Sequence, residues 1–136
     1  MYIKKSKLNI VLVGAGYWGT NIAKNLIKLK VNRIIVCDSN ANNSKLLKKR
    51  FPNNITINNN YKLLIKNKNI KYFIFATPPS KNFKLISDAL KFDKKIFIEK
   101  PGFKNLNELI KIKKKYPKNI NNISFGYIYM FNNFIK

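Results

Sequence analysis

Short apolar runs alternate with segments of helical periodicity along the whole chain, and this alternation limits the fold more than any other feature. The runs that we expect to form strands are Leu8–Val13, Arg33–Cys37, Ile55–Ile57, Tyr72–Ala76, Lys95–Ile98 and Asn122–Tyr129. Between them, apolar residues three and four positions apart predict helices. These segments are Thr20–Lys30, Asn42–Arg50, Tyr61–Asn67, Lys81–Lys91 and Asn105–Tyr116. Repeated βα units predict an α/β fold with a doubly wound, mainly parallel sheet in the strand order 3-2-1-4-5-6.

Length and composition indicate a single folded domain. The chain has 136 residues, of which 46% are hydrophobic and 13% aromatic, so it is too apolar for a disordered basic tail. No apolar run approaches the roughly 20 residues of a membrane helix, and residues 1–8 lack the apolar segment of a signal peptide. With no His and one Cys, the usual zinc and haem ligands are missing. We therefore expect a cytoplasmic protein with no metal site and no membrane association.

The net charge of +23 has two possible sources. It could mark a surface that binds polyanions in a salt-sensitive way. The chain also contains 26 Lys, 22 Asn and 20 Ile, together half of its residues, and A- and T-rich codons encode all three. Only Arg33 and Arg50 carry the guanidinium group that suits base recognition. We therefore expect no specific nucleic-acid partner.

A glycine motif follows the first predicted strand. Gly14, Gly16 and Gly19 fit the pattern G-x-G-x-x-G, with a strand before them and a helix after them. In a dinucleotide-binding turn the first glycine permits the tight turn, the second admits a pyrophosphate and the third lets helix and strand pack closely. Tyr17 and Trp18 lie inside the motif and join the expected cofactor-binding residues. The alternative is a strand-to-helix turn with no ligand.

Asp38 ends the second predicted strand, 19 residues after Gly19. A carboxylate at this place can accept hydrogen bonds from the ribose hydroxyls of a dinucleotide. It would also repel a 2′-phosphate, so the sequence favours NAD over NADP, although lysines such as Lys45 lie nearby. The competing role for Asp38 is to cap the helix that starts near Asn40.

Two further motifs end the fourth and fifth predicted strands. Thr77 and Pro78 follow the fourth strand beside the switch point of the sheet, where Pro78 keeps Thr77 extended and facing a cofactor. The alternative is a plain helix start at the prolines. Glu99, Lys100 and Pro101 end the fifth strand, and by position Lys100 could meet a substrate hydroxyl or carboxylate. By spacing alone it is equally a surface lysine.

Together, the glycine motif, Asp38, Ala76–Pro79 and Glu99–Pro101 resemble the amino-terminal half of the glucose–fructose oxidoreductase and inositol dehydrogenase (Gfo/Idh/MocA) family, whose cofactor domain is a Rossmann fold. The resemblance covers nearly the whole chain. It implies an NAD(P)-dependent oxidoreductase that moves hydride between nicotinamide and a sugar, cyclitol or sugar nucleotide. It also implies that Lys100 is catalytic and assists proton transfer at the reacting hydroxyl. Glu99 would orient Lys100 or the nicotinamide ribose, and the Lys100–Pro101 bond would be cis.

The resemblance also sets the expected domain organisation. Residues 1–125 correspond to the NAD(P)-binding domain, and residues 126–136 to the start of a linker toward a substrate domain. Many members carry Arg and Pro where Met130 and Asn133 stand. An apolar residue at the first of these positions favours a sugar-nucleotide substrate. In the family the second domain supplies a catalytic His and most of the oligomer interface, so we expect this half to be inactive and unlikely to oligomerise by itself. The alternatives are a stand-alone NAD-responsive or polyanion-binding module without catalysis, and a degenerate remnant.

Overall fold

Within residues 6–126, which the computed structural model describes, six parallel strands form one sheet in the order β3-β2-β1-β4-β5-β6. The strands are β1 (Ser6–Val13), β2 (Val31–Cys37), β3 (Ile55–Ile57), β4 (Tyr72–Phe75), β5 (Lys95–Glu99) and β6 (Ile123–Gly126). The helices are α1 (Tyr17–Lys28), α2 (Ala41–Arg50), α3 (Tyr61–Lys66), α4 (Pro79–Lys91) and α5 (Leu106–Lys115), with a 3-10 turn η1 (Ile120–Asn122) before β6. The predicted α/β fold and strand order are confirmed.

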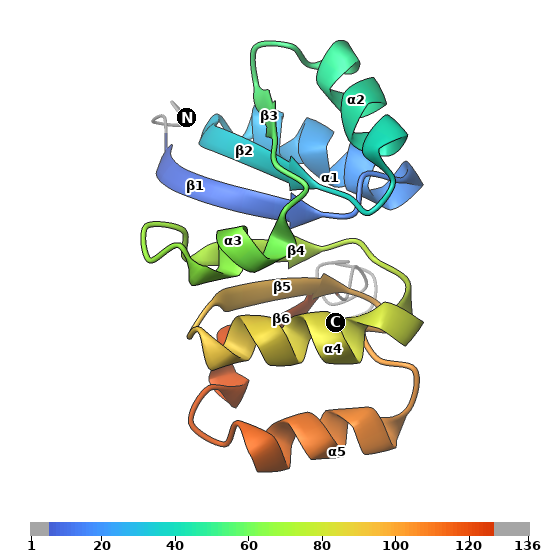
Figure 1. Ribbon diagram of the computed structural model, residues 1–136, viewed down its shortest axis with the longest axis vertical. Coiled ribbons are helices and arrows are strands. Elements are labelled where there is room, and N and C mark those ends of the chain that lie inside the picture. Colours follow the sequence, from blue (N-terminus) through green and yellow to red (C-terminus); the bar gives the residue numbers. More distant parts are fainter. Residues whose placement is uncertain (1–5, 127–136) are drawn as a thin grey trace, which may run out of the picture.

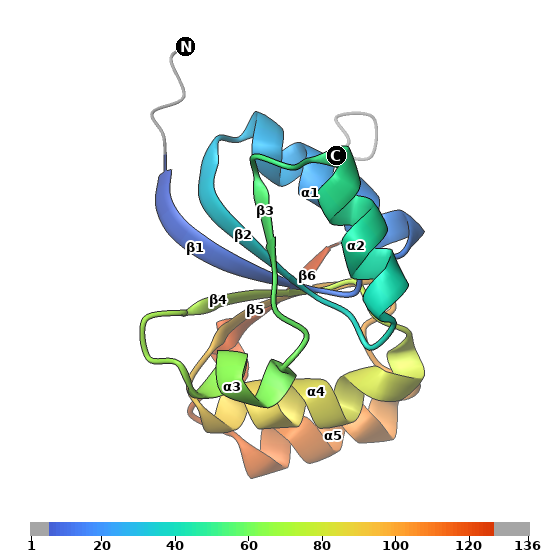
Figure 2. The ribbon, with the colours of Figure 1, turned by 45° about the horizontal axis from the view of Figure 1, so that its top comes forward.

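Helices cover the two faces of the sheet, with α1 and α2 on one side and α3, α4 and α5 on the other (Figures 1 and 2). Successive side chains of a strand point to opposite faces of the sheet, so each strand contributes side chains to both layers. In β1, Ile10 and Leu12 pack in the α1–α2 layer, whereas Val11 and Val13 pack in the layer under α3, α4 and α5. All four side chains are at most 7% exposed. Burial on both faces explains why the second half of β1, residues 10–13, is a continuous apolar run in the sequence.

Two helices begin two or three residues earlier than the periodicity predicts. Helix α1 starts at Tyr17 rather than Thr20, because Tyr17, Trp18 and Gly19 form a first turn that lacks the apolar spacing of the rest of the helix. Helix α4 starts at Pro79 rather than Lys81, since the fixed φ of proline suits the first helical position. Both shifts bring a helix amino-terminus next to the end of a strand.

The order of the sheet reverses between β1 and β4. The chain passes from β1 to β2 and β3 on one side, then returns to place β4 on the other side of β1. The strand ends are joined by backbone hydrogen bonds: the N–H of Gly14 donates to Cys37 O at 2.9 Å, and that of Ala76 donates to Val13 O at 2.8 Å. Doubly wound sheets bind ligands in the crevice that opens at such a reversal.

The expected linker at residues 126–136 lies, apart from Gly126, outside the described residues, as does the end of the sixth predicted strand. Over residues 6–126 no helix has both the length and the apolar character needed to cross a membrane.

Candidate functional site

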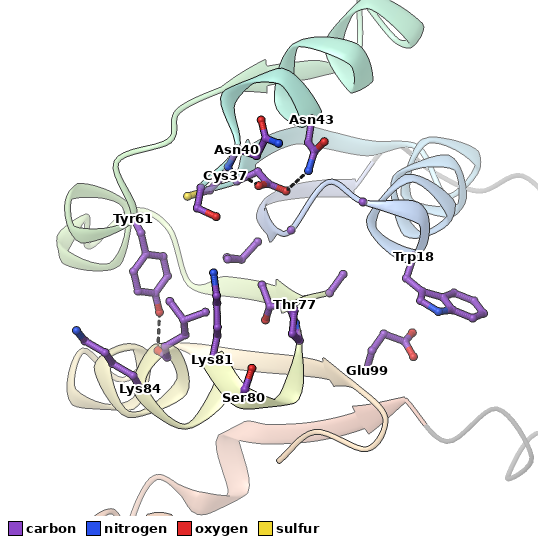
Figure 3. Close-up of a pocket in the computed structure, with 18 of the residues that line it drawn as sticks. Trp18, Cys37, Asn40, Asn43, Tyr61, Thr77, Ser80, Lys81, Lys84 and Glu99 are labelled. Carbon is purple, nitrogen blue, oxygen red and sulfur yellow. Dashed lines mark hydrogen bonds between the residues drawn. The ribbon is translucent and has the colours of Figure 1, made fainter. Parts of the chain in front are cut away.

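A cleft of about 1290 Å³ opens at the carboxyl ends of the strands, where the sheet order reverses. It brings together nearly all of the residues that the sequence motifs single out. Its walls include Gly14, Gly16, Tyr17, Trp18, Asp38, Thr77, Pro78, Glu99 and Lys100. Figure 3 shows Trp18 and Glu99 near one end of the cleft, Cys37, Asn40 and Tyr61 near the other, and Thr77 and Lys81 between them.

The three motif glycines meet different surroundings. Gly14 has φ of +96°, and a Cβ on it would lie 2.4 Å from the backbone oxygen of Ala76. A Cβ on Gly19 would lie 2.0 Å from Gly14 O, so α1 packs directly against the turn. Gly19 is buried and is not among the residues that line the cleft. Gly16 is exposed, and no atom lies within 4 Å of its Cβ position. Two of the glycines thus shape the turn, while Gly16 leaves open space over it.

Helix α1 begins directly after this open space. Its N-cap is Gly16, and no side chain caps the first turn. The first N–H groups of a helix lack intrahelical partners and carry partial positive charge, which favours an anion there. A phosphate group fits this place because a backbone donor array and room for the group occur together.

Asp38 connects the turn after β2 to the glycine turn. One carboxylate oxygen accepts from the N–H of Ala15 at 2.7 Å, and the other accepts from the N–H of Asn40 at 2.7 Å. The Asn43 amide donates to the first of these oxygens at 3.4 Å (Figure 3). The competing role as a helix cap falls to Asn40, whose side chain accepts from Asn42 N at the start of α2. A carboxylate has about four acceptor positions, so Asp38 retains capacity for a ligand hydroxyl.

Asn59, on the loop after β3, hydrogen-bonds to both Asp38 and α2. Its side-chain oxygen accepts from the N–H of Asp38 at 3.1 Å and from the hydroxyl of Ser44 at 3.0 Å. Ser44 is fully buried on α2. The β2–α2 and β3–α3 loops are thereby held together at one end of the cleft. Sequence reasoning missed both residues, because nothing distinguishes Asn59 from the other asparagines of the Asn-rich segment around it.

Thr77 lies at the middle of the cleft and is half-buried. Its hydroxyl donates to the side-chain oxygen of Asn82, a buried residue in the first turns of α4. Pro78 is the N-cap of α4 and Pro79 its first residue. Asn82 was also missed by sequence reasoning, since a polar residue near a helix start is typical of a solvated surface.

Glu99 is the last residue of β5, and Lys100 follows it. Glu99 is half-buried and Lys100 is exposed, and both border the cleft. The bond between Lys100 and Pro101 is cis, which confirms the expectation drawn from the family resemblance. The cleft therefore has a carboxylate and an amine together at the end opposite Asn40 and Tyr61.

Tyr61 and Cys37 border the other end of the cleft. The Tyr61 hydroxyl donates to Leu85 O on α4 at 2.6 Å, which links α3 to α4 (Figure 3). Burial, and then the charges of Asp88 and Cys37, raise the pKa of Tyr61 above its usual value. Burial, and then the neighbouring Asp38, raise the pKa of Cys37 to about 11. Both groups are therefore neutral near pH 7 and serve as walls rather than as acids or bases.

Basic side chains in the described part of the chain occur on both sides of the sheet. The last turn of α2 contains Lys48, Lys49 and Arg50, and the last turn of α5 contains Lys113, Lys114 and Lys115. These helices cover opposite faces. Cations at helix carboxyl ends also complement the helix dipole, so their placement has a structural cause.

The cleft suits an elongated ligand. An acid at one end can accept from hydroxyl groups, an uncapped helix start at the middle can hold an anion, and a carboxylate and an amine stand at the other end. A dinucleotide has this order of groups, namely a ribose, a pyrophosphate and a second nucleoside.

Comparisons with known proteins agree with this geometry. A family model described as "Oxidoreductase family, NAD-binding Rossmann fold" (GFO_IDH_MocA) matches residues 8–127. No curated protein sequence matches the chain significantly.

Solved structures with the same fold include a myo-inositol dehydrogenase from Corynebacterium glutamicum, with a TM-score of 0.82 and 19% identity over 94% of this chain. They also include a myo-inositol 2-dehydrogenase from Lactobacillus plantarum, with a TM-score of 0.75 and 22% identity over 94% of this chain. A scyllo-inositol dehydrogenase from Lactobacillus casei, solved with NAD(H) and scyllo-inositol, has a TM-score of 0.74 and 17% identity over 94% of this chain. This chain spans 38% of the length of each of the three.

Proposed function

Since this chain belongs to the Gfo/Idh/MocA oxidoreductase family and folds as its NAD-binding Rossmann domain, we propose that it holds the cofactor of an enzyme that oxidises or reduces a sugar, cyclitol or sugar nucleotide. The observation that carries the proposal is the open space at Gly16 over the uncapped start of α1, with Asp38 tied to the same turn.

Each wall of the cleft has a proposed part in binding. The N–H groups at the start of α1 hold the pyrophosphate, and Asp38 accepts from the ribose hydroxyls at the adenosine end. Tyr17, Trp18, Thr77 and Pro78 line the same cleft and would contact the bound dinucleotide. The fit rests on this chain's own residues, since the site combines donors for an anion with an acceptor for hydroxyls.

Lys100 and Glu99 are the proposed groups at the reacting end. When bound, the nicotinamide ring supplies a hydride donor or acceptor. A protonated Lys100 stabilises negative charge that develops on a substrate oxygen, and its amine can exchange a proton with that oxygen. Glu99 orients Lys100 or the nearby ribose.

The substrate class remains part of the proposal. Two of the solved structures are a myo-inositol and a scyllo-inositol dehydrogenase, which supports a polyol or sugar-type substrate. We further propose that turnover needs a second domain, because hydride transfer requires the substrate carbon to be held close to the nicotinamide. The chain alone then binds dinucleotide without catalysis.

Asp38 supports NAD as the preferred cofactor. Its carboxylate stands where a ribose would lie and would repel a 2′-phosphate. The described residues of the β2–α2 turn, Ser39 and Asn40, bring no compensating cation. NADP should therefore bind more weakly than NAD.

Calorimetric titration of the chain with NAD and NADP tests the proposal, with tripolyphosphate as a polyanion control for the +23 charge. We expect heat from NAD above the tripolyphosphate control, a smaller response to NADP, and loss of the NAD signal in Gly16→Val, where the side chain fills the open space. Asp38→Ala should weaken NAD and reduce the preference over NADP. Equal heats from NAD and tripolyphosphate, or unchanged NAD binding in Gly16→Val, would refute the cofactor assignment.

A further inference from the structure

Asn82 is a buried polar side chain whose amide oxygen and amide nitrogen are both hydrogen-bonded. It is 1% exposed on α4. Its oxygen accepts from the hydroxyl of Thr77, and its NH₂ group donates to the backbone oxygen of Gly102 at 2.6 Å. Buried polar groups are costly unless they are hydrogen-bonded, and here both ends of the amide are paired.

These two partners belong to neighbouring strand ends. Thr77 lies just after β4, and Gly102 lies just after the cis bond between Lys100 and Pro101 at the end of β5. β4 and β5 pair in parallel up to Phe75 and Ile98. Beyond that point the Asn82 side chain bridges the turns that follow the two strands, both of which border the cleft through Thr77 and Lys100.

We propose that Asn82 is a positioning residue that sets the separation between the Thr77 turn and the Lys100–Gly102 turn, and so fixes the width of the cleft at its nicotinamide end. The inference rests on the proposed function, because that function assigns this end to the nicotinamide. Asn82 does not line the cleft and acts through the two turns it joins.

The bridge requires an amide of this length. It needs an acceptor for the Thr77 hydroxyl and a donor for the Gly102 carbonyl, and the Asn82 amide supplies these on two separate atoms. Gly102 leaves little freedom on its side, since it has φ of +82° and a Cβ on it would lie 2.6 Å from the ring of Phe125. The Lys100–Gly102 turn is thus held between the β6 side chain and Asn82.

The Asn82 bridge lies at one end of the cleft, so its loss should affect only the part of a ligand that binds there. Asp38, Asn40 and Tyr61 mark the far end of the cleft, and their side chains hydrogen-bond to Ala15, Asn42 and Leu85 rather than to Asn82. A ligand that reaches only the adenosine and pyrophosphate part should not sense the loss of the bridge. In the proposed binding mode NAD would reach past Thr77 to Lys100, so the loss of the bridge should weaken its binding.

The test compares NAD with ADP by calorimetry in Asn82→Leu, which removes both hydrogen bonds, and in Asn82→Asp, which keeps an acceptor for Thr77 but sets an oxygen against Gly102 O. We expect each variant to weaken NAD about tenfold and to leave ADP within about twofold of wild type, the size of effect that loss of a pre-formed site gives.

Asn122→Leu is the matched control. Asn122 is also a buried amide with two partners, Asp93 and Lys95, but it lies at the opposite end of the strands, just before β6. The Asn122→Leu variant should lower the midpoint of thermal unfolding, as Asn82→Leu does, without changing the ratio of NAD affinity to ADP affinity. Asn82→Ser carries the test if the other Asn82 variants do not fold, because its hydroxyl is tolerated as a donor and acceptor but is too short to bridge Thr77 and Gly102.

The outcomes separate the inference from the function on which it rests. If wild type binds NAD and the Asn82 variants bind it equally well, or if they weaken NAD and ADP by the same factor, the positioning role is overturned while the cofactor assignment stands. If wild type binds neither ligand above the tripolyphosphate control, the cofactor assignment itself fails, and the inference falls with it.

Discussion

The carboxylate of Asp38 accepts a hydrogen bond from the backbone N–H of Ala15 at 2.7 Å, so the end of β2 is joined to the glycine turn that follows β1. The same carboxylate accepts from Asn40 N at the entry to α2. One side chain therefore ties two turns together at the mouth of the cleft. The proposed ribose and pyrophosphate positions are coupled through it, because moving Asp38 also releases the turn over which the pyrophosphate would lie.

Replacing Asp38 by Asn should damage both stability and binding. The Asn side chain keeps the shape but must turn its NH₂ group toward a backbone N–H, at either Ala15 or Asn40. We expect the free energy of unfolding to fall by about 1–3 kcal/mol, since a donor is left without an acceptor. NAD affinity should fall at least about tenfold, the effect of losing a charge-assisted contact. Urea unfolding and calorimetry measure the two effects.

Asp93→Asn is the matched control for this substitution. Asp93 accepts from Asn119 and Asn122 at the opposite end of the sheet and has φ of +52°, a conformation that Asn also tolerates. It should lower stability and leave NAD affinity unchanged. An Asp38→Asn protein that binds NAD as well as Asp93→Asn does would contradict the ribose-binding role.

The motif glycines should respond differently to the same small substitution. A Cβ on Gly19 would lie 2.0 Å from the backbone oxygen of Gly14, so Gly19→Ala must push α1 away from the turn. We expect a loss of about 1–3 kcal/mol in unfolding free energy, the usual cost of overpacking. Gly16→Ala meets no atom within 4 Å and should change stability by no more than about 0.5 kcal/mol. Equal losses of stability in the two variants would contradict this division of roles.

The sequence predicts the sheet well because the physical signal is local. The second halves of β1 and β2, residues 11–13 and 34–37, are buried on both faces, so each appears as an uninterrupted apolar run. The strand order then follows from the rules for parallel crossover connections. Helix starts are less visible, since the first turn of α1 contains Gly19, and glycine is a poor helix former whose place there is set by contact with Gly14.

The support of the site could not be predicted, because it depends on contacts across long stretches of chain. Asn82 contacts Gly102, 20 residues away, and Asn59 contacts Asp38, 21 residues away. The chain has 22 asparagines, and local sequence gives no reason to single out these two. The motif residues were found because their role depends on backbone shape at a strand end, whereas the residues behind them are defined only by the packed structure.

Lys94 is a buried lysine that should contribute to the stability of the fold. It is 4% exposed, and its amine donates to the backbone oxygens of Asn67 and Ile70 at 2.8 and 2.7 Å, in the connection from α3 to β4. Lys94→Met should lower the free energy of unfolding by about 1–3 kcal/mol, because it removes a charged donor from each of these two oxygens. Lys91→Met, an exposed position on α4, should change it by no more than about 0.5 kcal/mol. Similar denaturation midpoints for the two variants would show that the buried amine does not hold the connection.

The contribution of Cys37 to the stability of the chain should depend on pH. The thiol is 3% exposed, and burial, followed by the charge of Asp38, raises its pKa from 9.0 to about 11. Well below pH 9 both the folded and the unfolded chain keep the thiol proton, so the stability that Cys37 contributes is complete there. As the pH rises from about 9 to about 11 the unfolded chain loses the proton before the folded chain does, which favours unfolding.

The free energy of unfolding of wild type, relative to Cys37→Ala, should therefore fall by about 2 kcal/mol between pH 8 and 11, since each unit of pKa shift is worth about 1.4 kcal/mol and the full effect is reached only above pH 11. The variant has no thiol to titrate but keeps the same lysines and tyrosines, so their contributions largely cancel in the difference. Urea unfolding of both proteins at pH 8, 9, 10 and 11 measures it. A constant difference would mean that the thiol ionises as easily in the folded chain as in the unfolded one, and would contradict the raised pKa of Cys37.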